Sequence, residues 1–167
     1  MQYDSIMIRY GELTLKGKNK KTFIDTLANN IRQSLADMKE LKFEKQYDRF
    51  YVHIQENSNL EEIILRLKSI PGIHNFSFVK KVNKDIEEIC QTSLEIFQET
   101  LKELDNPCLT FKVKASRSDK TLSYVSDDIN RKVAAIILKN NSCKVDVHQP
   151  DLTIKIEVRL DACYIMM

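Results

Sequence analysis

The stretch Lys144-Val-Asp-Val-His-Gln-Pro-Asp-Leu-Thr-Ile-Lys-Ile-Glu-Val-Arg159 contains two segments of alternating apolar and polar residues, joined by a short turn. Period-two alternation is typical of strands, because successive side chains point to opposite faces of a sheet. It places six apolar residues on a predicted core face: Val145, Val147, Leu152, Ile154, Ile156 and Val158. We predict a rigid turn between the strands, stabilised by Asp146, His148, Pro150 and Asp151. Pro150 fixes one backbone dihedral, and Asp151 can accept from the backbone just after it.

The first 82 residues carry apolar periodicities that switch between strand and helix. Strands are predicted at residues 3–10, 42–47, 49–55 and 73–82, with one helix starting near Asn19 and another ending at Pro71. Ser58 and Glu61 have the spacing of a capping box, which predicts the start of the second helix. The order β-α-β-β-α-β is that of a ferredoxin-like domain, an antiparallel sheet with two helices on one side.

Residues 83–167 continue with a helix that Asn83 can cap, a strand at 109–115, a helix from Ser126 and two or three closing strands. No Ser/Gly-rich linker separates this part from the first. The sequence therefore predicts an α+β protein with one domain at residues 1–82 and a second at residues 83–167.

Charge is distributed unevenly along the chain, although the net charge is only +2. Residues 112–144 contain eight basic and three acidic side chains, whereas residues 84–105 contain two basic and seven acidic ones. A polyanion would be attracted to the first segment and repelled by the second.

Two groups of basic residues are candidates for contact with nucleic-acid phosphates. Lys112 and Lys114 share one face of a predicted strand, and Arg117 follows at its exit, so we expect three cations along one edge. A second group surrounds the glycine at position 17, before a helix whose first N–H groups are free. The predicted RNA-binding residues are Lys16, Lys18, Lys112, Lys114, Arg117, Lys120, Arg131 and Lys132. An ordinary solvated surface is the alternative for both groups.

Two motifs resemble one known family. The segment at residues 145–151, followed by Ile156-Glu-Val-Arg159, resembles the closing strands of the THUMP domain, an RNA-binding module of tRNA-modifying enzymes. The segment Arg9-Tyr-Gly-Glu-Leu-Thr-Leu-Lys-Gly-Lys-Asn19 resembles the opening of bacterial tRNA 4-thiouridine synthetases, which are also linked to thiamine biosynthesis. With residues 111–117 included, the resemblance extends over essentially the whole chain. It implies a ferredoxin-like domain followed by a THUMP domain.

The resemblance also implies a division of labour. This chain would bind tRNA at the acceptor stem and 3′ end, and would contain neither catalytic residues nor a cofactor. In the family, a C-terminal domain with a Ser-Gly-Gly-x-Asp-Ser loop, which this sequence lacks, uses ATP and magnesium to thiolate uridine 8. The sulfur comes from a cysteine desulfurase, and family members are commonly homodimers. We therefore expect a cytoplasmic tRNA-binding portion of a sulfurtransferase, and whether the chain itself counts as an enzyme stays open.

Several other classes of site are disfavoured by spacing. The four cysteines form no Cys-x-x-Cys pair, and His53, His74 and His148 have no partner at metal-ligand spacing. No run of about 18 apolar residues predicts a membrane span. The segment from Gly11 to Asn19 differs from a phosphate-binding P-loop in spacing and lacks its final hydroxyl.

Two alternatives from other functional classes remain. One is a small hydrolase of the acylphosphatase type, in which Arg9 and Asn19 would hold phosphate. The other is a protein-interaction module, whose apolar contacts would make binding insensitive to salt.

Overall fold

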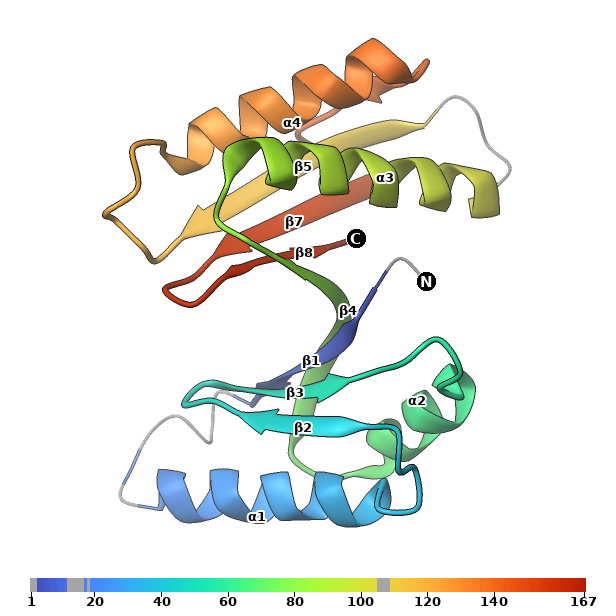
Figure 1. The fold of residues 1–167 in the computed structure, drawn as a ribbon, viewed down its shortest axis with the longest axis vertical. Helices are drawn as coiled ribbons and strands as arrows, with labels where there is room; N and C mark the ends of the chain where they lie inside the picture. Colours follow the sequence, from blue (N-terminus) through green and yellow to red (C-terminus); the bar gives the residue numbers. More distant parts are fainter. Residues whose placement is uncertain (1–2, 12–16, 18, 105–108) are drawn as a thin grey trace. The chain divides into compact units, whose positions relative to one another are not determined.

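The computed structural model describes residues 3–11, 17, 19–104 and 109–167. These residues form two compact units, 3–78 and 79–167, each built from strands and helices (Figure 1). The predicted α+β class is confirmed. The predicted domain limit at Val82 stays a prediction.

The first unit contains β1 (Ser5–Tyr10), α1 (Lys20–Ser34), β2 (Lys42–Lys45), β3 (Arg49–His53), α2 (Leu60–Ser69) and the start of β4 (Ile73–Val82). This is the predicted β-α-β-β-α-β order of a ferredoxin-like domain. The strands are arranged in the order β2-β3-β1-β4, and β3 is antiparallel to both β1 and β2.

The core of this unit lies between the sheet and its two helices (Figure 1). The helices bury apolar residues at helical spacing: Ile24, Leu27, Ala28 and Ile31 from α1, and Ile63 and Leu67 from α2. They pack with residues of β1 and β3, namely Ile6, Ile8, Phe50 and Val52. Full burial of one such large side chain stabilises the fold by roughly 1.5–3 kcal/mol. Each helix therefore turns its apolar side chains toward the sheet, and their spacing in the sequence reveals the helix.

The caps of two helices differ from the predicted ones. Asn59, not Ser58, directly precedes α2, and its side chain accepts from the N–H of Glu62 at 3.2 Å. Asp85, not Asn83, directly precedes the helix that begins at residue 86, and its Oδ1 accepts from two N–H groups of the first turn. The residue directly before the first helical residue is the one whose side chain is best placed to accept from these N–H groups. Both predicted caps were therefore displaced by one or two positions.

The second unit contains α3 (Ile86–Leu104), β5 (Thr110–Arg117), α4 (Ser126–Asn140), β6 (Lys144–Val145), β7 (Leu152–Val158) and β8 (Cys163–Met166). Its strand order is β4-β8-β7-β5-β6, in which β5 runs parallel to β6 and β7. Helices α3 and α4 cover one face of this sheet (Figure 1). On that face the rings of Phe97 and Phe111 pack with centroids 5.1 Å apart.

Two residues predicted to be in the core are exposed. Val145 is 46% and Val147 is 54% exposed, whereas Ile154, Ile156 and Val158 on β7 are buried. β6 is a two-residue edge strand, so its outer side has no neighbouring strand to cover it. Alternation assigned Val145, the register partner of the buried Phe111, to the correct face, but it does not predict whether that face is covered.

Candidate nucleic-acid interface

The face of the second sheet that α3 and α4 leave uncovered carries adjacent lysines. On β5 the even-numbered residues point away from Phe111, and on β7 the odd-numbered residues point away from the buried Ile154. Lys114 is the register partner of Lys155, and Lys112 is the partner of Thr153. These four residues, Lys112, Lys114, Thr153 and Lys155, are called the open sheet face below.

Lys114 and Lys155 make the middle of the open sheet face positively charged, while Glu157 follows Lys155 on the same face of β7. Lys114 and Lys155 are exposed, and no hydrogen bond or ion pair from either of them is found within the described part of the chain. Like charges on directly opposed sheet residues repel and cost stability. An oxyanion held between the two ammonium groups would replace this repulsion with two attractions.

Lys112, unlike Lys114 and Lys155, forms a hydrogen bond with another residue that the structure describes. Its Nζ donates to the carbonyl oxygen of Val147 at 3.0 Å, so it holds the segment before β7 against β5. Lys112 is half-buried, whereas Lys114 is exposed. Lys114 and Lys155 are therefore the more available cations of the open sheet face.

Arg117 does not join these lysines. As an odd-numbered residue of β5 it lies on the helix-covered side, and its Nη1 donates to the carbonyl oxygens of Leu122 at 3.1 Å and Tyr124 at 2.6 Å. The expected edge of three cations is thus split between two faces. The guanidinium stabilises the loop at residues 118–125, which connects β5 to α4.

An ion pair fixes the same loop to the start of α3. Asp119 is only 4% exposed and accepts from Lys84 Nζ at 2.7 Å and from the hydroxyl of Thr121 at 2.6 Å. Lys84 Nζ also donates to the carbonyl of Leu160 at 2.7 Å, and the Tyr124 hydroxyl donates to the Lys84 carbonyl at 2.6 Å. The hydrogen bonds from Lys84 and Thr121 hold the pKa of Asp119 well below its usual range.

This lowered pKa makes the stability of the fold depend on pH. A carboxylate whose pKa is lower in the folded than in the unfolded state contributes stability above about pH 4, and that contribution is lost as the pH falls. We expect Asp119→Asn to lower the urea midpoint at about pH 7 and to lose less stability than wild type on acidification to about pH 3. The exposed Glu99→Gln is the control. Identical acid profiles for Asp119→Asn and wild type would contradict this assignment.

The cations of α4 pair with carboxylates. Arg131 Nη2 donates to Asp128 Oδ1 at 2.8 Å and its Nε lies 3.6 Å from Asp127 Oδ2. Lys132 Nζ lies 3.8 Å from Glu87 Oε1. The pKa of Asp128 is lowered by the backbone N–H at the helix start and by Arg131. Arg131 and Lys132 lie on α4, in the helix layer. Their surroundings contain carboxylates as well as basic groups.

Of the three remaining predicted cations, only Lys120 lies within the described residues. Lys120 is exposed in the loop between β5 and α4. Lys16 and Lys18 lie outside the described residues. None of the eight predicted RNA contacts is tested by the geometry itself, so each stays a prediction.

Two aspartates hold the turn before β7: the Asp146 carboxylate bonds within the turn, and the Asp151 carboxylate bonds to Thr110 of β5. Asp146 Oδ1 accepts from the N–H groups of His148 at 2.8 Å and Gln149 at 3.0 Å. Asp151 Oδ2 accepts from both the N–H and the hydroxyl of Thr110, each at 2.8 Å. The expected bond from Asp151 to the backbone after it is thus replaced by a contact across strands. These N–H donors lower the pKa of both carboxyls, so both are charged at neutral pH.

Other classes of site receive no support from the described residues. No three His, Cys, Asp or Glu side chains among them gather as metal ligands. No helix in this part of the chain has the length and apolar content needed to cross a bilayer. Arg9, the candidate phosphate-binding residue of the hydrolase alternative, has its Nη1 3.4 Å from both Asn75 Oδ1 and Ser77 Oγ.

Comparison with known protein families agrees with the motifs in the sequence. Residues 5–77 match the ThiI ferredoxin-like domain, and residues 83–167 match the THUMP domain. The chain belongs to the THUMP domain family. The residues from α3 to β8, including the open sheet face, lie within its THUMP domain.

Relatives and solved structures align with nearly the whole length of this chain. A probable tRNA sulfurtransferase from Lactobacillus acidophilus is 39% identical over 99% of this chain, which spans 40% of that protein. A crystal structure of a 4-thiouridine synthetase–RNA complex with bound ATP is 36% identical, with a TM-score of 0.84 over 98% of this chain and 40% of that one. The crystal structure of PH1313 from Pyrococcus horikoshii Ot3 is 30% identical, with a TM-score of 0.83 over 98% of this chain and 53% of that one.

One candidate in the THUMP domain was missed by sequence reasoning. Lys155 occupies the middle of β7, between Ile154 and Ile156, two of the apolar residues on which the strand prediction rests. The same alternation that buries these two isoleucines places Lys155 on the opposite face. Its proximity to Lys114 depends on the parallel pairing of β5 and β7, which are far apart in sequence.

Proposed function

We propose that this chain is the tRNA-holding portion of a tRNA 4-thiouridine synthetase. The observation that carries the proposal is the joint match to the ThiI ferredoxin-like and THUMP domains in a single chain. The likeness to a 4-thiouridine synthetase solved with RNA supports it further. In this role the chain binds the acceptor stem and 3′ end of tRNA, so that uridine 8 is presented to a catalytic domain.

The open sheet face is suited to holding an RNA backbone. Lys114 and Lys155 supply two adjacent point charges on a sheet surface, which can neutralise phosphates without reading bases. The turn tied by Asp146 and Asp151 keeps the strands in register. A rigid clamp on one part of a folded RNA fixes the position of another part, which is how binding energy accelerates a reaction at a distance.

The chemical steps belong to another part of such an enzyme. We assign ATP, magnesium and the sulfur delivered by a cysteine desulfurase to the portion of the relatives that this chain does not span. The expected homodimer, the cytoplasmic location and the link to thiamine biosynthesis are part of the same proposal.

Titration with tRNA at several salt concentrations tests the proposal. When phosphate contacts dominate binding, the logarithm of the affinity falls with the logarithm of salt concentration, with a slope set by the number of contacts. Three contacts, from Lys112, Lys114 and Lys155, predict roughly a 10- to 100-fold loss between about 50 and 200 mM salt. A DNA duplex of similar length serves as the control and should bind more weakly. A chain that fails to bind tRNA, or binds it equally at all salt concentrations, would rule the proposal out.

A further inference from the structure

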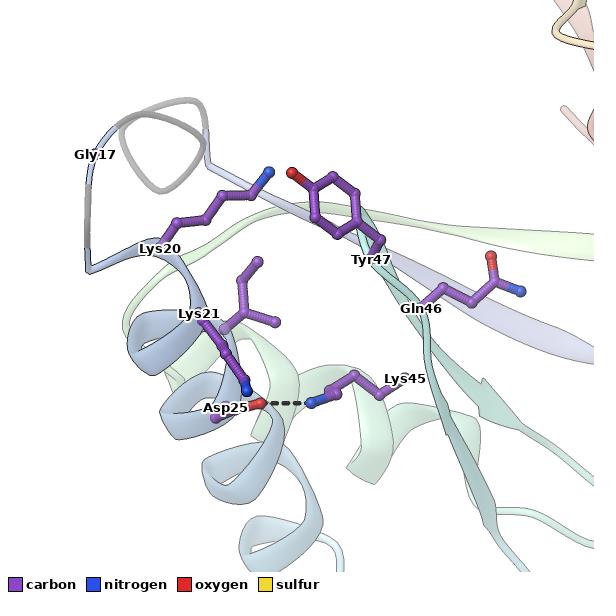
Figure 2. A pocket seen from close by; sticks show the side chains of 8 residues that line it. Gly17, Lys20, Lys21, Asp25, Lys45, Gln46 and Tyr47 are labelled. Atoms are coloured by element: carbon purple, nitrogen blue, oxygen red, sulfur yellow. Dashed lines mark hydrogen bonds and ion pairs between the residues drawn. The ribbon is translucent and has the colours of Figure 1, made fainter.

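A pocket of about 500 Å³ lies in the ferredoxin-like unit, between the start of α1 and the tip of the β2–β3 hairpin (Figure 2). Its walls combine basic, aromatic and apolar groups: Lys20, Lys21, Ile24, Asp25, Lys45 and Tyr47. None of these residues belongs to the open sheet face. The pocket is therefore a separate candidate for ligand binding.

Tyr47 is the aromatic wall, and it is 78% exposed. The Nζ of Lys20 lies over its ring, 3.8 Å from the centroid, and Figure 2 shows the lysine extending from α1 toward the ring. A cation on one ring face leaves the other face available for stacking. An exposed aromatic ring beside a basic pocket is the arrangement that stacks on an unpaired base.

The hairpin holds Tyr47 firmly in place. The N–H of Gln46 donates to the carbonyl of Arg49 at 2.8 Å, which closes a tight turn around Tyr47 and Asp48. The buried hydroxyl of Tyr10 donates to the Arg49 carbonyl at 3.1 Å. Burial, followed by the charge of Asp48, raises the pKa of Tyr10 to about 12, so this hydroxyl remains a donor at neutral pH. These hydrogen bonds restrict the backbone at Tyr47 and so fix the position of its ring.

The charge of the pocket favours an anion. Among the described residues, three lysines line it against one carboxylate, that of Asp25. Asp25 forms an ion pair with Lys45, and the hydrogen bond from Lys45 lowers its pKa, so one positive charge is neutralised there. Lys20 and Lys21 remain to bind phosphate. In addition, Asn19 makes no side-chain capping bond at the start of α1.

We infer that this pocket binds one unpaired nucleotide of the RNA, with its base stacked on the open face of Tyr47 and its phosphate bound by Lys20 and Lys21. The combination of ring, ammonium groups and apolar floor fits a nucleotide better than a bare phosphate, which would not use the aromatic wall. This inference rests on the proposed function, because it presumes an RNA ligand. It adds a second contact on a different unit of the chain.

The absence of tryptophan from the sequence allows a direct test. Tyr47→Trp introduces a single indole at the hairpin tip, and its fluorescence should be quenched in a saturable manner by a seven-nucleotide single-stranded RNA. A blunt RNA duplex should quench it little. Leu65→Trp, at a 65% exposed position on α2, is the matched control and should respond to neither RNA.

Affinity measurements on the unlabelled chain complete the test. Tyr47→Ala should weaken binding of the seven-nucleotide RNA by about 5- to 100-fold, whereas Tyr47→Phe, which keeps the ring, should stay within about twofold of wild type. Lys20→Ala should also weaken binding. Equal affinities for wild type and Tyr47→Ala would overturn the inference.

Whole tRNA and AMP are two further probes. They distinguish a wrong assignment of the pocket from a wrong proposal for the function of the chain. If whole tRNA binds the chain but leaves the indole at position 47 unquenched, only the pocket assignment is wrong. If tRNA does not bind at all, both are wrong. If AMP alone quenches the indole as strongly as the seven-nucleotide RNA at equal concentration, the pocket is a site for free nucleotides and the RNA assignment is overturned.

Discussion

The double variant Lys114→Glu, Lys155→Glu is expected to bind tRNA roughly 10- to 100-fold more weakly than wild type at about 100 mM salt. The two lysines are register partners on neighbouring strands, so both substitutions place negative charge at one point of the open sheet face. Loss of two phosphate contacts should also reduce the slope of log affinity against log salt by about two. Fluorescence anisotropy with labelled tRNA measures both quantities.

A matched control separates local from general electrostatic effects. Lys102→Glu, Lys139→Glu changes the net charge by the same amount, but on exposed positions of α3 and α4 in the helix layer. We expect it to reduce affinity by less than about threefold, because exposed charges more than a Debye length apart are largely screened. Equal losses in the two double variants would show that the open sheet face has no special role.

Phe111→Ala is expected to lower the free energy of unfolding by about 3–5 kcal/mol, as is typical of large-to-small substitutions of a buried aromatic residue. Phe111 is fully buried on β5, and its ring packs against Phe97 of α3. The substitution would leave a cavity directly beneath the strand that carries Lys112 and Lys114. Urea unfolding measures the loss.

The matched control for this prediction is Tyr47→Ala. It removes an aromatic ring of similar size from a position that is 78% exposed, so it should change stability by less than about 0.5 kcal/mol. Phe111→Leu, which fills most of the space, should cost much less than Phe111→Ala. A cost below about 1 kcal/mol for Phe111→Ala would contradict the assignment of Phe111 to the core of the second unit.

Most of the fold could be predicted from the sequence because its signals are local. The order of strands and helices follows from apolar spacing, and the helix that begins at Ser126 was predicted at its first residue. The caps at Asn59 and Asp85 were missed because several polar residues precede each helix, and the sequence does not show which one directly adjoins it. The exposure of Val145 was missed because burial depends on neighbours that are distant in the chain.

The candidate site was predictable only in part, for the same reason. The basic character of β5 is a property of the sequence, but the partner of Lys114 depends on which strand pairs with β5. Arg117 looks like a third surface cation until the following loop folds back and places two carbonyl oxygens against its guanidinium. Likewise, Tyr47 and Tyr51 both lie in predicted strands, and the sequence does not show that the turn closes around Tyr47 and leaves it exposed.

Lysine acetylation of the chain with and without bound tRNA, read out by mass spectrometry, tests whether the open sheet face contacts the RNA. We predict that tRNA protects Lys114 and Lys155 several-fold while Lys102 and Lys139 react as they do in the free chain. Full reactivity of Lys114 and Lys155 in the complex, with protection of the helix-layer lysines instead, would contradict it.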